Sequence, residues 1–347
     1  MKNYFDLRSQ NAIDRMRQIL REMPEFVMDY FVGIEQTTSP LTRLNYAYDL
    51  RLFLDYLVNM LDLFQGKKVK ELVVTDLNLV KAKHIERFLS YLSSYVDDEN
   101  NRITNGDQSK ARKLSSIKSF FKYFYNRDYI NENVTSKVEM PKLHEKPIIR
   151  LETDEVVKLL ETVEDGGNLT EREKAYHKYT KTRDVAILTL LLGTGIRVSE
   201  CVGLNFDDVD FEIDGIKITR KGGNQEIVYF GDEVRVALMD YMRERLSKIS
   251  IKVEPALFLS LQEKRLGVRA IQLLVKKYAS VTTPLKKITP HKLRSTYGTS
   301  LYKETNDIYI VADVLGHKDV NTTRKHYAAV SDDMRRNVAN KVKLRDN

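Results

Sequence analysis

Residues 289–330 read TPHKLRSTYGTSLYKETNDIYIVADVLGHKDVNTTRKHYAAV. This short segment holds two histidines, an arginine and a candidate nucleophilic tyrosine: His291, Arg294, His317 and Tyr327. A cation, two imidazoles and a phenol are most of what is needed to attack a phosphodiester without a metal ion. The apolar spacing predicts three helices here, over 291–304, 308–315 and 320–328. We therefore expect upstream segments to complete a site built on these helices.

The composition describes an ordinary globular chain with an excess of positive charge. It has 347 residues, 42% hydrophobic and 31% charged, which favours two domains with sizeable cores. Lysine and arginine number 57 against 49 acidic residues, a net charge of +8. That balance favours a polyanionic partner without requiring one.

Several classes of protein are disfavoured by what the sequence lacks. The one cysteine, Cys201, excludes an internal disulfide, and its apolar surroundings favour a buried, inert thiol. The N-terminus has no apolar signal-peptide core, and no apolar run approaches the length of a membrane span. We expect a cytoplasmic protein that makes no membrane contact.

The first region, roughly 1–140, is predicted to be all helical. Apolar residues recur at helical spacing over 8–35, where Pro24 is expected to separate two helices. Ser39 followed by proline is a strong helix start. Two more helices are expected, over 81–95 and from about 109 onward, with a turn-rich loop at 97–108 between them.

Basic residues of this region are expected on helix faces turned away from the apolar ones. For one helix alone a solvated surface is the simpler interpretation, but several basic faces in one small domain favour phosphate contacts. The residues assigned to DNA binding on this ground are Arg43, Arg51, Lys110, Arg112, Lys113, Lys118 and Lys122.

Proline and charge mark residues 141–150 as a linker, and a second domain is expected over 151–347. It should open with a helix at 152–163 and a polar insertion at 164–182. The apolar run 185–192 predicts a buried helix broken by two glycines. Arg197 follows them at the start of a short helix, where a guanidinium needs an anion, either Glu200 or a ligand phosphate.

The period then changes from helical to alternating. Residues 208–230 predict a three-stranded antiparallel meander, with Asp214-Gly215 in its first turn. Lys221 lies at the second turn, where a lysine is ordinarily only solvated. Helices are predicted again at 232–249 and 268–279, and the tail 331–347 is a basic helical stretch.

Four signatures in this order resemble the tyrosine site-specific recombinases, the integrase and Xer group. They are GTGIRVSE at 193–200, TRKGGNQE at 219–226, TPHKLRST at 289–296 and LGHKDVNTTRKHY at 315–327. The likeness spans about 40–330 and looks nearest to the single-recombinase Xer proteins. It implies a mainly α fold, in which an all-helical SAM-like core-binding domain precedes a mixed α/β catalytic domain. It also implies that six residues are catalytic: Arg197, Lys221, His291, Arg294, His317 and Tyr327.

The expected chemistry assigns each of these six a role. Tyr327 attacks the phosphorus and leaves a 3′-phosphotyrosine, while His291 accepts the phenolic proton. The two arginines and His317 would stabilise the non-bridging oxygens. Lys221 would protonate the departing 5′ oxygen. No cofactor is expected, since the sequence has no Walker loop or paired-metal carboxylate cluster.

Two positions depart from the family pattern. Ser295 stands where a second histidine is frequent, and Tyr327 lies one residue farther from His317 than in many Xer proteins. The segment holds other tyrosines, for which packing within helices is the simpler interpretation: Tyr297, Tyr302 and Tyr309. His326, beside Tyr327, is expected to have no catalytic role.

The resemblance also implies the partners. These are duplex DNA with a specific inverted-repeat site and a homotetramer on that DNA, with 331–347 as the contact between protomers.

One alternative is a type IB topoisomerase, which would relax plasmids without sequence preference. A non-catalytic DNA-binding protein is another, and a suicide-substrate cleavage assay separates it from an enzyme. Dimer resolution and integration or excision of a mobile element stay open as roles.

Overall fold

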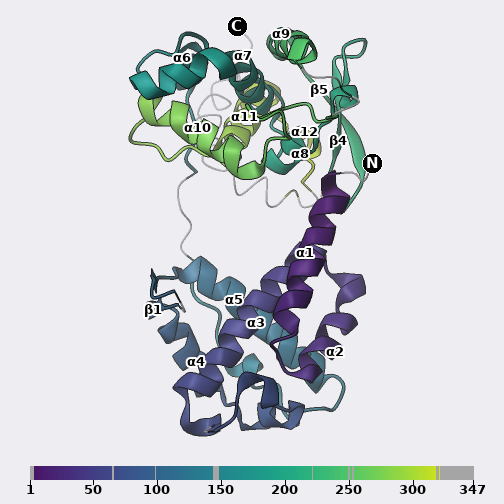
Figure 1. Cartoon of the computed structure of the whole chain (residues 1–347), viewed down its shortest axis with the longest axis vertical. Coiled ribbons are helices and arrows are strands. Elements are labelled where there is room, and N and C mark those ends of the chain that lie inside the picture. Colours follow the sequence, from purple (N-terminus) through teal and green to yellow (C-terminus); the bar gives the residue numbers. More distant parts are fainter. Residues whose placement is uncertain are drawn as a thin grey trace, which may run out of the picture. The chain divides into compact units, whose positions relative to one another are not determined.

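The computed structural model describes residues 4–64, 66–97, 99–143, 148–220, 222–248, 251, 254–317 and 320. The chain divides into two compact units, Met1–Lys146 and Pro147–Asn347, and each is described by itself (Figure 1). The architecture is mainly helical with a small antiparallel sheet, as the sequence predicts.

Where the structure describes it, the first unit consists of five helices joined by 3-10 turns and one very short hairpin. The helices are α1 (Tyr4–Leu20), α2 (Glu25–Gly33), α3 (Pro40–Met60), α4 (Ala82–Tyr91) and α5 (Asp107–Tyr125). The 3-10 turns are η1 (Glu35–Thr37), η2 (Asp62–Phe64), η3 (Val69–Glu71), η4 (Val74–Leu79) and η5 (Val134–Lys137). The hairpin strands are β1 (Tyr95–Val96) and β2 (Arg102–Ile103), a pair that the helical prediction did not include.

Local signals explain where these helices begin. Pro24 separates α1 from α2, as predicted. Ser39 caps α3, its hydroxyl accepting the Thr42 N–H at 3.2 Å, with proline in the first helical position. The core forms where α3, α4 and α5 meet: the Phe53 ring lies 5.2 Å from Phe88 and 6.3 Å from Phe121, centroid to centroid.

In its described residues the second unit combines seven helices with the sheet. Its helices are α6 (Thr153–Asp165), α7 (Glu171–Thr194), α8 (Val198–Gly203), α9 (Asp232–Lys248), α10 (Val268–Thr282), α11 (Pro290–Thr305) and α12 (Ile308–Leu315). A 3-10 turn, η6 (Phe206–Asp208), leads into β3 (Val209–Asp210), β4 (Gly215–Thr219) and β5 (Gln225–Tyr229). Helix α7 packs against α6, α9 and α11 and so forms the centre of this unit.

The expected polar insertion before residue 185 is largely wrong, because its second half is the start of α7. Thr170 and Glu173 form a capping box: the Thr170 hydroxyl accepts the Glu173 N–H at 3.3 Å, and the Glu173 carboxylate accepts the Thr170 N–H at 3.0 Å. Gly193 lies inside the helix, which ends at Thr194 with Gly195 in the left-handed conformation. A single helix therefore carries the chain up to the Arg197 segment.

The sheet has the predicted three-stranded antiparallel order, β3-β4-β5. Asp214, at φ +50°, makes the turn into β4. In β4, Ile216 and Ile218 face inward and are almost fully buried, and Ile218 is paired with Glu226 of β5. Alternation along β4 therefore places the next residue of that face, Arg220, toward the interior.

The cysteine and the apolar content of the helices bear on two expectations from the sequence. Cys201 is buried in α8, which confirms the predicted burial, and burial raises the pKa of its thiol. Of the helices that the structure describes, none is both long enough and apolar enough to cross a membrane.

Candidate active site

Arg197 stands at a sharp reversal between α7 and α8. Gly195 closes α7 at φ +62°, and a Cβ there would lie 2.4 Å from the Tyr297 ring, so the reversal requires glycine. Arg197 then occupies the N-cap position of α8, and its side chain is 35% exposed. Of the two anions that the sequence left open, the structure shows Glu200.

Glu200 is the buried carboxylate that holds this arginine. Its side chain is 2% exposed. It accepts the Arg197 backbone N–H at 2.7 Å and the Arg197 guanidinium at 2.9 Å. A third donor, Arg220, approaches the same carboxylate at 3.4 Å. One buried negative charge therefore stabilises two cations.

Arg294 and His291 come from the first turns of α11. Arg294 is buried and donates to the Gly195 carbonyl at 2.7 Å and to the Leu315 carbonyl. His291, three residues earlier, is on an exposed part of the same helix. Residues three apart on a helix lie on neighbouring positions of one face, which places the imidazole near the arginine.

His317 follows the end of α12. Gly316 closes that helix at φ +61°, and the His317 N–H donates to the Ala312 carbonyl at 2.8 Å. Arg197 donates to the Gly316 carbonyl at 3.2 Å, next to the Leu315 carbonyl that Arg294 contacts. The C-terminal end of a helix carries partial negative charge, which suits it to hold cations.

Three of the six predicted catalytic residues thus meet at one place, the end of α12. They are Arg197, Arg294 and His317. His291 shares a helix with one of them. Lys221 and Tyr327 lie outside the described residues, as do the helix predicted at 320–328, apart from residue 320, and the tail 331–347.

Arg220 belongs to this arrangement, although sequence reasoning did not single it out. It is 9% exposed and donates to two carboxylates and to carbonyls at the end of α12. Burial by itself lowers the pKa of Arg220. The contacts with Glu226 and Glu200 outweigh this effect, so the pKa lies above its ordinary value. The alternation of Ile216 and Ile218 was the available signal, since the same period points Arg220 inward.

The basic residues proposed for DNA binding differ in their surroundings. The expectation that Arg43 faces outward is wrong: it is 4% exposed. Its guanidinium donates to the Glu35 carbonyl at 2.7 Å, the Thr38 carbonyl at 2.9 Å and the Glu35 carboxylate at 3.1 Å. Arg43 closes the turn before α3, and we remove it from the proposed DNA contacts.

On α5, Arg112 and Lys113 share a buried partner in Asp49. Arg112 donates to both Asp49 oxygens, at 2.5 and 2.7 Å, and is 47% exposed; Lys113 donates at 3.2 Å and is 12% exposed. Ser116 adds a fourth hydrogen bond at 2.7 Å. Arg112 therefore keeps an accessible edge, whereas Lys113 is mostly enclosed.

The remaining proposed contacts are held less tightly. Arg51 is 39% exposed and pairs with Glu22 at 3.3 Å. Lys110 donates to Ser93 and Lys118 to the Val138 carbonyl, each at 2.7 Å. Lys122 is exposed. No group of three or more His, Cys, Asp or Glu residues within the described ranges could hold a metal ion.

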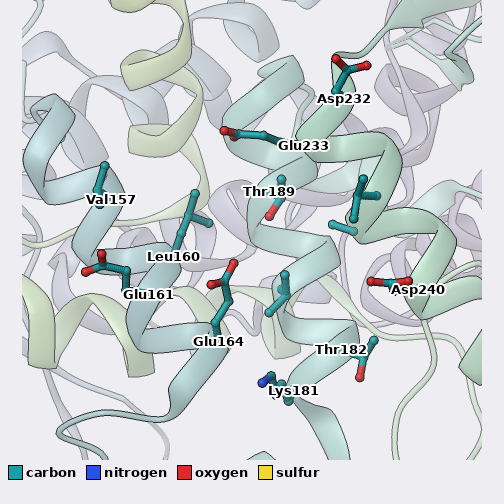
Figure 2. A pocket seen from close by; sticks show the side chains of 13 residues that line it. Val157, Leu160, Glu161, Glu164, Lys181, Thr182, Thr189, Asp232, Glu233 and Asp240 are labelled. Atoms are coloured by element: carbon teal, nitrogen blue, oxygen red, sulfur yellow. The ribbon is translucent and has the colours of Figure 1, made fainter.

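A groove of about 740 Å³ lies elsewhere in the second unit, between α6, α7 and α9. Figure 2 shows Glu161 and Glu164 on one side and Glu233 and Asp240 on the other. Lys181 is the one lysine or arginine among its described lining residues. Carboxylates repel phosphate, so this groove does not suit a nucleic acid backbone.

Known proteins resemble this chain in sequence. Residues 149–334 match the family model described as "Phage integrase family". The chain is 34% identical to tyrosine recombinase XerC of Caldanaerobacter subterraneus subsp. tengcongensis, over 92% of this chain and 86% of that protein. Tyrosine recombinase XerS of Streptococcus equi subsp. zooepidemicus is 29% identical, over 90% of this chain and 94% of the relative.

A solved structure shares the fold of this chain. The crystal structure of XerH site-specific recombinase bound to palindromic difH substrate has a TM-score of 0.64 at 16% identity, covering 95% of this chain and 96% of that one. The chain belongs to the phage integrase family of tyrosine recombinases. It is a DNA-cleaving and rejoining enzyme of site-specific recombination, which confirms the family resemblance in the sequence.

Proposed function

We propose that the chain recombines specific DNA sites through a covalent intermediate on Tyr327. The single observation that carries this assignment is the convergence of Arg197 and Arg294 on the end of α12, beside His317. Two arginines at one place can donate paired hydrogen bonds to the non-bridging oxygens of one phosphate. Carbonyls at helix ends accept part of the hydrogen bonds that Arg197 and Arg294 can donate, and so hold both guanidinium groups in position.

In the proposed reaction, the Tyr327 oxygen attacks the scissile phosphorus and the bond to the 5′ oxygen breaks. His291 takes the phenolic proton, because a phenol with a pKa of about 10 is a poor nucleophile at neutral pH. Lys221 gives a proton to the 5′ oxygen, which leaves as a hydroxyl. Rejoining is the reverse: a 5′ hydroxyl attacks the phosphotyrosine and releases the phenol. The covalent bond conserves the phosphodiester, so no nucleotide is consumed.

Unit 1 is assigned to holding duplex DNA, and unit 2 to catalysis. The phosphate contacts we retain are Arg51, Lys110, Arg112, Lys118 and Lys122, and we set Lys113 aside because it is mostly enclosed and paired with the buried Asp49. Relatives have been solved as a lambda integrase tetramer on a Holliday junction and as XerH on palindromic difH. By analogy we assign this chain a tetramer on an inverted-repeat site, with 331–347 between protomers.

We assign the biological role to chromosome dimer resolution in the cytoplasm. Its support is that XerC and XerS relatives match this chain over nearly its whole length. Integration or excision of a mobile element uses the same chemistry. Sequencing the DNA trapped on the protein in cells decides between the roles: a single chromosomal inverted repeat is expected, and the ends of a mobile element would contradict dimer resolution.

The nucleophile is tested with Tyr327→Phe on a nicked suicide duplex. We expect normal duplex binding in a mobility-shift assay and no covalent adduct on a denaturing gel. Tyr309→Phe is the matched control, since Tyr309 is a 70% exposed tyrosine of α12. It should form the adduct as the parent does. An adduct that persists in Tyr327→Phe would rule out this tyrosine.

A further inference from the structure

Arg220 immediately precedes the turn that carries Lys221. Its backbone N–H donates to the Asn224 carbonyl at 2.7 Å, and its carbonyl accepts the Gly223 N–H at 3.1 Å. These two bonds join Arg220 to the far side of the β4–β5 turn. A side chain that fixes residue 220 therefore also fixes the base of that turn.

The Arg220 side chain joins three separate segments. Across the hairpin it makes a two-pronged pair with Glu226, at 2.8 and 2.9 Å. Toward α8 it reaches Glu200 at 3.4 Å, the carboxylate that holds Arg197. Toward α12 it donates to the Val314 carbonyl at 3.2 Å and the Leu315 carbonyl at 3.4 Å.

Gly316 makes this junction possible. A Cβ on Gly316 would lie 2.8 Å from the Arg220 Cζ, so the guanidinium packs directly against the residue before His317. The pKa of Glu226 lies below its ordinary value because Arg220 donates to it, so the pair stays ionised. A planar guanidinium is the one side chain that can serve two carboxylates and two carbonyls together.

We propose that Arg220 is a positioning residue that fastens the β4–β5 turn to α8 and to the end of α12, where Arg197 and Arg294 converge, and so delivers Lys221 to the leaving 5′ oxygen. This inference rests on the proposed function, in which Lys221 is the proton donor. Without the Arg220 side chain, the turn would lose its contacts with α8 and α12, while Arg197 would keep its own two bonds to Glu200. The loss should therefore fall on proton transfer rather than on phosphate binding.

Leaving-group chemistry separates these two effects. In ordinary DNA the departing 5′ oxygen needs the proton of Lys221 when its bond to phosphorus breaks. If sulfur replaces that bridging oxygen, the phosphorus–sulfur bond breaks to give a thiolate. A thiol has a pKa of about 8.5, so a thiolate departs at neutral pH without a proton donor. A defect confined to proton donation should then disappear.

The experiment measures single-turnover cleavage of a suicide duplex with either oxygen or sulfur at the bridging 5′ position. Arg220→Met should cleave the oxygen substrate about 100-fold more slowly than the parent and the sulfur substrate within about threefold of it. Lys221→Met should show the same pattern. Arg235→Met is the matched control, because Arg235 pairs with Asp214 at the other turn of this sheet. It should match the parent on both substrates.

Arg220→Lys covers the case in which the methionine variant fails to fold, as judged by thermal melting and duplex binding. Lysine keeps the charge but cannot make the two-pronged pair, so the same selective defect is expected. Equal slowing of Arg220 variants on both substrates, or no slowing on oxygen, would overturn the inference. If Lys221→Met is not rescued by sulfur, the proton-donor assignment fails instead, and a parent protein inactive on both substrates would contradict the proposed function itself.

Discussion

Replacing Glu200 by glutamine should destabilise the second unit selectively. The Glu200 side chain is 2% exposed and accepts three hydrogen bonds, two from Arg197 and one from Arg220. Glutamine has nearly the same volume, so no cavity forms. Its amide nitrogen, however, cannot accept a hydrogen bond and turns a donor toward guanidinium donors. The substitution therefore leaves two cations without their shared negative charge.

The expected loss of unfolding free energy depends on how exposed Arg197 and Arg220 are. Removing one side of a buried ion pair costs about 3–5 kcal/mol. Arg197 is 35% exposed, so water screens part of its loss, and the Arg220 contact is long at 3.4 Å. We therefore expect about 3 kcal/mol, the lower end of that range. For a unit of about 200 residues this corresponds to a fall in Tm of about 6–12 °C.

Scanning calorimetry is the suitable assay, because the chain has no tryptophan for fluorescence and two units to resolve. Glu171→Gln is the matched control: Glu171 is 92% exposed and pairs with Lys174 at 3.0 Å. Exposed pairs contribute about 0–1 kcal/mol, so its Tm should move by less than about 4 °C. If the Tm of Glu200→Gln falls no more than that of Glu171→Gln, the buried carboxylate does not stabilise the two arginines as inferred.

Three further changes test other parts of the molecule. Asp49→Asn removes the carboxylate shared by Arg112 and its neighbours and should lower the unfolding free energy of the first unit by about 3 kcal/mol, with the second calorimetric transition unmoved. Gly195→Ala would place a carbon 2.4 Å from the Tyr297 ring at φ +62°, and the combined strain and crowding should cost about 2–4 kcal/mol in urea unfolding; an unchanged midpoint would contradict the close packing. Burial and nearby cations lower the pKa of His84 below its usual 6.5, so the unfolded chain binds more protons and stability is lost as pH falls through that value. His84→Gln should weaken this pH dependence between about pH 7.5 and 5, whereas an identical slope would exclude His84 as its source.

The fold was predictable wherever local chemistry decides the conformation. Ser39 with the following proline fixed the start of α3, and alternation through Ile216 and Ile218 identified the sheet. The start of α7 was missed because its first turns lack an apolar stripe and expose residues such as Tyr176. The capping pair at Thr170 and Glu173 was a usable signal, since that spacing satisfies two helix-end donors.

The sequence identified candidate residues of the site but did not show which groups they contact. The sequence offered Arg197 two anions, and only the packed chain shows that Glu200 is held beside it. In the sequence Arg43 resembled a surface cation, because its partners are mostly main-chain carbonyls. Every residue has a main-chain carbonyl, so the sequence gives no sign of such a partner. Arg220 was overlooked for the related reason that its partners come from α8, α12 and β5 together.

The end of α12 has a consequence for how the enzyme matures. Three arginines, Arg197, Arg220 and Arg294, donate hydrogen bonds to main-chain carbonyls at this helix end. Contacts between such distant parts of a chain require loop closure and form late in folding. A nascent chain on the ribosome, or one trapped as an intermediate, therefore has no assembled phosphate pocket. Folding must therefore be complete before the three arginines converge on the end of α12.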